Sequence, residues 1–250
     1  MTRRILFLTL AAATLGAQEL TLDQVLQKHY EAMGGVEKMK ALKTLRMTGK
    51  MVIMGGQMEA ATTMVMKRPN KMRMDMNIQG RSLIRASDGA TAWQTNPFVG
   101  SGEPAAMTGD EAKDMLESAG DMDGVLIDYK AKGHTVELLG KEDVEGSAAY
   151  KLKVTRKSSR VETHFLDASS FFPVKIQSKV TQAGQEMEVE SFPGNFKKVE
   201  GVMTPHSIDQ KVGGRSMMAV TMEKIEPNVE VDDAMFKMPA PAPKPEEKKN

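Results

Sequence analysis

Four histidines are the side chains best suited to acid–base or nucleophilic chemistry, and none of them lies in a recognisable catalytic motif. His29 falls in a helical pattern, His134 follows a glycine in a turn, and His164 lies on the polar side of a strand pattern; the fourth is His206. No G-x-S-x-G or H-E-x-x-H sequence surrounds any of them. We therefore expect no catalytic residues, no cofactor and no enzyme activity.

Methionine is the second residue type that could do chemistry, as a soft thioether ligand for Cu(I). The chain has 22 methionines, including the runs Met64-x-Met66 and Met72-x-Met74-x-Met76. Alternate residues on one strand stand about 7 Å apart, and no His or Cys lies nearby to complete a site. Packing or cavity lining is therefore favoured over a metal site, because methionine is a flexible apolar side chain.

The segments that carry these methionines alternate with a period of two, which is typical of strands with one dry face. The third segment is the clearest, because its apolar residues alternate strictly with polar ones from Lys71 to Ile78. The predicted dry face consists of Leu45, Met47, Met51, Ile53, Met58, Ala60, Thr62, Met64, Met66, Met72, Met74, Met76 and Ile78. Shorter strands are predicted near Leu83–Ser87 and Thr91–Thr95, joined by an Asp-Gly turn.

Three helices are predicted between and before the strands. Thr21–Met33 and Thr108–Ala119 each begin with a capping-box sequence, Thr21 with Gln24 and Thr108 with Glu111. A short helix is expected over Val36–Leu42. The helix that begins at Thr108 interrupts the strands and is expected to pack across the sheet.

Strand patterns resume after Gly133 and continue to about Ile225. Lys175 and Lys179 are expected to pair with the glutamates of Glu186–Glu190 across a hairpin near Gln182–Gly184. With about ten strands in all, we expect an α+β fold built on a large curved antiparallel sheet whose concave face is covered by helices.

The ends of the chain predict export and a disordered tail. Residues 1–17 read as a signal peptide, with Arg3 and Arg4 before the apolar run Ile5–Leu15 and a cleavage point near Ala17. Residues 239–250 are Pro-rich and then charged, which indicates disorder. Residues 18–238 are expected to form one domain. The absence of cysteine excludes disulfides, and the net charge of +1 gives no reason to expect a nucleic-acid partner.

One segment resembles the LolA/LolB-like superfamily of periplasmic lipoprotein carriers. The similarity is carried by Lys67-Arg68-Pro69-Asn70, then Ser87-Asp88-Gly89, Thr91, Trp93 and Asn96-Pro97-Phe98-Val99, with Val231–Phe236 near the end. The resemblance implies an unclosed β-barrel with a helical lid over an apolar cavity for acyl chains. It also implies that Arg68 is a latch that hydrogen-bonds to the lid.

The resemblance and the methionine pattern together predict a periplasmic carrier for lipoprotein acyl chains or a related lipid, working with an inner- or outer-membrane transfer partner. The Thr108–Ala119 helix is the candidate lid. The predicted ligand-binding residues are Met47, Met51, Met64, Met66, Met72, Met74, Met76, Ile84 and Trp93. Two alternatives stay open: an envelope sensor or interaction protein of the same fold, and a methionine-rich Cu(I)-binding protein.

Overall fold

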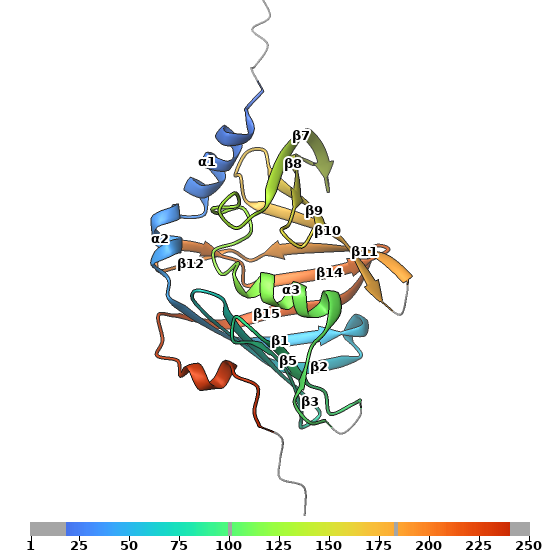
Figure 1. Cartoon of the computed structure of the whole chain (residues 1–250). Helices are drawn as coiled ribbons and strands as arrows, with labels where there is room; N and C mark the ends of the chain where they lie inside the picture. The colour runs from blue at the N-terminus through green and yellow to red at the C-terminus, as the bar shows by residue number, and fades with distance from the viewer. Residues whose placement is uncertain (1–18, 100–101, 183–184, 241–250) are drawn as a thin grey trace, which may run out of the picture.

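The computed structural model describes residues 19–99, 102–182 and 185–240, and its main element is one antiparallel sheet (Figure 1). Within these residues the sheet has thirteen strands in the order β6-β5-β4-β3-β2-β1-β15-β14-β11-β10-β9-β8-β7. The strands are β1 (Thr44–Ile53), β2 (Met58–Lys67), β3 (Lys71–Ile78), β4 (Arg81–Ser87), β5 (Ala92–Thr95), β6 (Ala105–Ala106), β7 (Thr135–Val144), β8 (Ser147–Thr155), β9 (Val161–Asp167), β10 (Pro173–Gln182), β11 (Gln185–Gly194), β14 (Ser207–Val212) and β15 (Arg215–Pro227).

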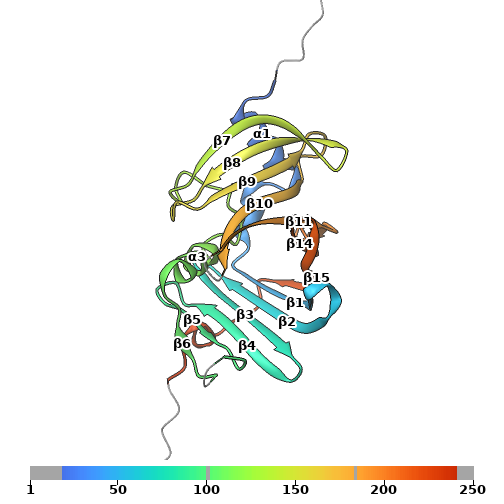
Figure 2. The same cartoon turned by 90° about the vertical axis from the view of Figure 1, so that its right-hand side faces the viewer.

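The sheet curls but does not close, which confirms the predicted α+β class and unclosed barrel. Pairing of β1 with β15 joins an N-terminal meander to a C-terminal one. Figure 2 shows β1–β5 and β7–β10 as two walls that face different ways, linked through β15, β14 and β11. The terminal strands of the order, β6 and β7, do not pair with each other. Two further strands, β12 (Lys197–Val199) and β13 (Val202–Thr204), form a separate hairpin.

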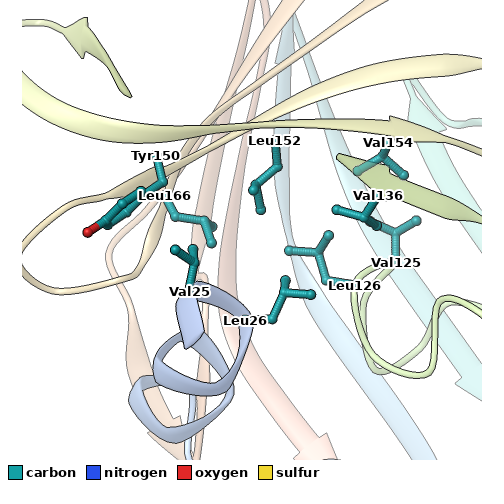
Figure 3. Close-up of a cluster of buried hydrophobic side chains, with 9 residues drawn as sticks. All are labelled: Val25, Leu26, Val125, Leu126, Val136, Tyr150, Leu152, Val154 and Leu166. Carbon is teal, nitrogen blue, oxygen red and sulfur yellow. The ribbon is translucent and has the colours of Figure 1, made fainter. Parts of the chain in front are cut away.

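The helix α1 (Leu22–Ala32) packs on the wall made by β7–β9, and its predicted capping box is confirmed. The Thr21 side chain accepts from the Gln24 amide, and the Gln24 side chain accepts from the Thr21 amide. Figure 3 shows the core beneath it, where the buried side chains are valine, leucine and one tyrosine. The residues are Val25, Leu26, Val125, Leu126, Val136, Tyr150, Leu152, Val154 and Leu166.

The helix α3 (Gly109–Ala119) lies over the methionine side of the other wall, but its predicted capping box is wrong. Thr108 makes no side-chain cap hydrogen bond. Glu111 instead forms an ion pair with Arg85 on β4, since α3 crosses that strand. The predicted apolar stripe of the helix is confirmed: Ala112, Met115, Leu116 and Ala119 pack on Met66 and Met72.

Two short elements complete the described chain: α2 (Val36–Ala41) and the 3-10 turn η2 (Asp233–Phe236). The predicted signal peptide over residues 1–17 lies outside the described residues, as do residues 241–250 of the predicted tail. Within the described part of the chain, none of the helices has the length and apolar character needed to cross a bilayer.

Candidate functional site

The concave face holds a cavity of about 390 Å³ whose wall is dominated by methionine. Eight of its twenty lining residues are methionines, from seven parts of the chain. They are Met33 at the end of α1, Met39 in α2, Met47, Met64 and Met66 on β1 and β2, Met122 after α3, and Met203 and Met222 on β13 and β15. Methionine has three rotatable bonds and a polarizable sulfur, so such a wall can adapt to ligands of different shape.

Arg68, at the turn between β2 and β3, binds two segments that line this cavity. Its Nε donates to the Leu42 carbonyl at 2.8 Å, and its Nη2 donates to the Met39 carbonyl at 3.0 Å. The same Nη2 lies 3.1 Å from Oδ2 of Asp123, in the segment after α3. The Met39 and Leu42 carbonyls lie at the C-terminal end of α2, where backbone carbonyls lack partners within the helix. One guanidinium therefore joins α2 and the Asp121–Gly124 segment to the sheet.

The Asp121–Gly124 segment is also held from its other side by buried ion pairs. Lys132 Nζ lies 2.7 Å from Asp123 and 3.1 Å from Asp121. Arg156, which follows β8, lies 2.8 Å from Asp121 and 2.9 Å from Glu162. Ion pairs in such buried positions are costly to break one partner at a time, because a charge is then left uncompensated. Ion pairs thus hold this segment, which lines the cavity, to both walls of the sheet.

His164 and Glu162 on β9 belong to this buried network, and the prediction that His164 lies on a polar outer face is wrong. Both side chains are buried, because Glu162 pairs in register with Val154, and His164 with Leu152, on the face that α1 covers. Burial alone would raise the pKa of Glu162. The hydrogen bond from His164, together with the charges of His164, Arg156 and Arg160, outweighs burial and lowers that pKa to about 2.

The described residues that line the cavity include three titratable side chains, Asp121, Asp123 and His206, and both aspartates are held in ion pairs. His206 is buried beside Thr204, whose carbonyl lies 3.0 Å from His206 Nδ1. Burial in the separate α1 interface lowers the pKa of His29, while the hydrogen bond to the Phe171 carbonyl partly opposes the shift. The site is therefore a cavity with mainly apolar walls and a few polar groups.

The structure brings three of the nine predicted ligand residues, Met47, Met64 and Met66, into the cavity wall. Met72 lies beside them on the same face but is buried under α3. Met51, Met74 and Met76 lie further along the same face, in a second apolar cluster that shares Val220 and Met222 with the cavity. The seven predicted methionines therefore lie on one face of the sheet. Three line the cavity, one lies under α3, and three lie in the adjoining apolar cluster.

Ile84 and Trp93 lie on the opposite face of the sheet. Ile84 pairs in register with Asp75, and Ala86 on the same strand pairs with both Arg73 and Trp93, so these side chains alternate with the methionines of β3. Trp93 is fully buried there, with its indole N–H donating to the Phe236 carbonyl in η2 at 2.7 Å. Neither residue is among those that line the cavity, so we leave both out of the site.

Five methionines that line the cavity were not predicted as ligand residues from the sequence: Met33, Met39, Met122, Met203 and Met222. Met33 ends the α1 apolar stripe, and Met203 N donates to its carbonyl at 2.8 Å. Gly34 permits this approach, since a Cβ at that position would lie 2.2 Å from the Gly201 carbonyl oxygen. The signal available in the sequence for these five cavity residues was the high methionine content of their segments.

Comparison with solved structures finds the same architecture in proteins of very different sequence. A LolA superfamily protein from Nitrosomonas europaea superposes with a TM-score of 0.56 at 15% identity, covering 88% of this chain and 98% of that one. A putative outer membrane lipoprotein-sorting protein domain from Vibrio parahaemolyticus gives 0.56 at 11% identity, covering 84% and 95%. The chain has a LolA-like fold.

A third similar structure, a DUF1329 family protein from Desulfovibrio piger, has a TM-score of 0.57 at 12% identity and covers 85% of this chain and 97% of that one. No family model matches the sequence, and no curated protein matches it. The LolA-like fold was thus expected from about 35 residues of local resemblance and is shown by the structure of nearly the whole described chain.

Proposed function

We propose that this protein is a periplasmic carrier that shelters the acyl chains of a lipoprotein or related lipid in the methionine-walled cavity. The main support is the combination of a LolA-like fold with a cavity on its concave face whose cover is fastened by Arg68. The similar structures include one whose name describes lipoprotein sorting. The sequence adds the predicted signal peptide over residues 1–17.

The dimensions of the apolar face suit an acyl chain. From Leu45 to Ile53 the inner face of β1 spans nine residues, or about 26 Å over the eight steps between them at the rise of a strand. One leaflet of a bilayer holds its acyl chains within about 15 Å, half of the hydrocarbon thickness. Each methylene moved out of water contributes about 0.8 kcal/mol. The length of this face therefore exceeds that of an acyl chain, and burial of the methylenes provides a substantial driving force.

We assign the cover of the cavity to α2 and the Asp121–Gly124 segment. They replace α3, the candidate lid from the sequence. Residues of both α2 and this segment line the cavity, whereas no residue of α3 does so. Both also bind Arg68. Release of these contacts would open the cavity without a change in charge, since arginine stays protonated. α3 instead covers the adjoining cluster around Met66 and Met72.

The carrier proposal is tested by changing the polarity of the wall while keeping its shape. A Met47→Gln/Met64→Gln variant places two amides in the apolar cavity, where they lack partners, and should weaken binding of a fluorescent fatty-acid probe at least tenfold. Met54→Gln is the matched control, because Met54 lies on a turn and is 55% exposed. It should bind the probe as the wild type does.

Native mass spectrometry of the protein purified from membranes should also detect a bound lipid. Failure of the wild type to bind either the natural lipid or the probe would refute the carrier proposal. Equal affinity in the cavity variant and the control would place the lipid site elsewhere.

A further inference from the structure

Methionine is concentrated in one half of the interior. The cluster under α3 has eleven members, of which seven are methionines: Met47, Met64, Met66, Met72, Met107, Met115 and Met122. We call it the thioether cluster. The core under α1 has nine buried members and seven partly buried ones, and none of the sixteen is a methionine (Figure 3). The same chain therefore builds an ordinary core from valine and leucine, and its overall methionine content does not explain the thioether cluster.

The sheet register places methionines of different strands directly opposite one another. Met47 on β1 is the direct partner of Met64 on β2, and Met64 is the direct partner of Met74 on β3. Met66 is likewise opposite Met72. Directly opposed Cβ atoms stand about 5 Å apart. The relevant spacing for a metal site is therefore the one between strands. The 7 Å spacing along one strand, which argued against metal binding, does not apply to it.

The thioether cluster opens onto the cavity. Met47, Met64, Met66 and Met122 belong both to the cluster and to the cavity wall. They come from two strands and from the segment after α3, and all four belong to one packed cluster beside the same cavity. Long flexible side chains can turn their sulfurs toward one ion there. In the described residues, no group of three or more His, Cys, Asp or Glu side chains is arranged to hold a metal.

We propose that Met47, Met64, Met66 and Met122 form a binding site for a soft monovalent metal ion, Cu(I), at the floor of the cavity. Thioether sulfur is a soft ligand that selects Cu(I) over the divalent ions preferred by carboxylate or imidazole. The site is reached through the cavity and does not require the carrier function. Binding changes no oxidation state, so Cu(I) must be supplied in reduced form.

The test uses Cu(I) alone, kept reduced by ascorbate under anaerobic conditions, in competition with a chromophoric Cu(I) chelator. The wild type should withdraw about one equivalent of Cu(I) from the chelator. A Met47→Leu/Met64→Leu/Met66→Leu variant keeps apolar volume while removing the sulfurs, and its affinity should fall at least tenfold. The control is Met54→Leu/Met217→Leu/Met238→Leu, in which three exposed methionines outside the cluster are changed. It should bind as the wild type does.

Folding of the leucine variant is checked separately, because its three residues also line the proposed lipid site. Amides of β8 and β9 should keep their wild-type hydrogen-exchange rates, since the core under α1 contains no methionine. The two proposals are distinguished in the wild type, where binding of Cu(I) and binding of the fatty-acid probe are measured independently. If that variant does not fold, Ag(I) added to the wild type gives a second measurement: methyl NMR signals of the four site methionines should shift, and those of Met54 and Met217 should not. No withdrawal of Cu(I) by the wild type, unshifted site methyl signals, or equal binding by the leucine variant would overturn the metal site and leave the carrier proposal standing.

Discussion

Replacement of Arg68 by leucine should release the cover of the cavity while the sheet stays folded. The guanidinium makes three interactions, with the Leu42 carbonyl, the Met39 carbonyl and the Asp123 carboxylate. Leucine can make none of them. The Asp123 side chain is only 4% exposed, but Lys132 remains 2.7 Å from it, so the carboxylate keeps one partner. The effect should therefore be confined to α2 and the segment around Asp123.

The magnitude follows from the kind of hydrogen bond that is lost. A hydrogen bond to a charged group contributes about 1.5–3 kcal/mol, and such contributions are not additive within one network. Because the Arg68 side chain is 27% exposed, we take about 3 kcal/mol for all three interactions together. At about 1.4 kcal/mol for each factor of ten, the closed state should lose roughly 100-fold in population relative to the open state.

Hydrogen exchange measured by mass spectrometry gives the assay. Amides in α2 and in residues 121–124 should exchange roughly 100-fold faster in Arg68→Leu, while amides of β8 and β9 keep their wild-type rates. Arg68→Lys keeps the charge but lacks the fork of donors. Its exchange rates in α2 should therefore lie between those of the wild type and those of Arg68→Leu. Arg215→Leu, at an exposed turn, controls for loss of a positive charge. Unchanged exchange in α2, or equal acceleration throughout the sheet, would refute the assignment of Arg68 as the latch.

Two further predictions concern parts of the structure outside the cavity. Because Glu162 has a folded-state pKa of about 2 against an ordinary value of 4.5, its stabilisation is present above pH 4.5 and is lost as pH falls toward 2. Urea unfolding should show that the wild type loses about 2 kcal/mol more than Glu162→Gln between pH 6 and pH 3; parallel pH profiles would contradict this. Trp93→Phe removes the indole hydrogen bond to the Phe236 carbonyl and should lower the free energy of unfolding by about 2 kcal/mol. Its affinity for the fatty-acid probe should stay within twofold of the wild type, and a larger loss would mean that Trp93 acts on the cavity.

Much of the fold could be predicted from the sequence, because it follows from local patterns of alternating residues and turn residues. The strict alternation from Met72 to Ile78 specifies which residues of β3 share a face, and the Asp88-Gly89 pair specifies the β4–β5 turn. The Lys175 and Lys179 ion pairs with Glu190 and Glu186 also follow from strand alternation. Each of these features depends on residues that are near one another in sequence or on a simple hairpin.

The site was less predictable, because alternation does not say which face of a strand becomes concave. On β9 the polar residues Glu162 and His164 face inward, because Arg156 and Arg160 neutralise Glu162 there and His164 binds Glu162. These partners are near in sequence, but their burial depends on α1 and on Asp121, which pairs with Arg156. On β4 and β5 the apolar Ile84 and Trp93 face the other way, because η2 returns from the end of the chain to cover Trp93. In both cases the covering segment lies far away in the sequence and leaves no local signal.

The segment after α3 links the two halves of the interior, and this arrangement determines how the cover can move. Val125 and Leu126 are buried in the valine–leucine core under α1, whose branched side chains pack in well-defined rotamers. Three residues earlier, Met122 packs into the thioether cluster, where side chains are flexible. Gly124 lies between them with φ of 89°, a conformation that glycine adopts without strain. When Arg68 is replaced, the faster exchange should therefore end at Gly124, and the amides of residues 125–127 should remain protected.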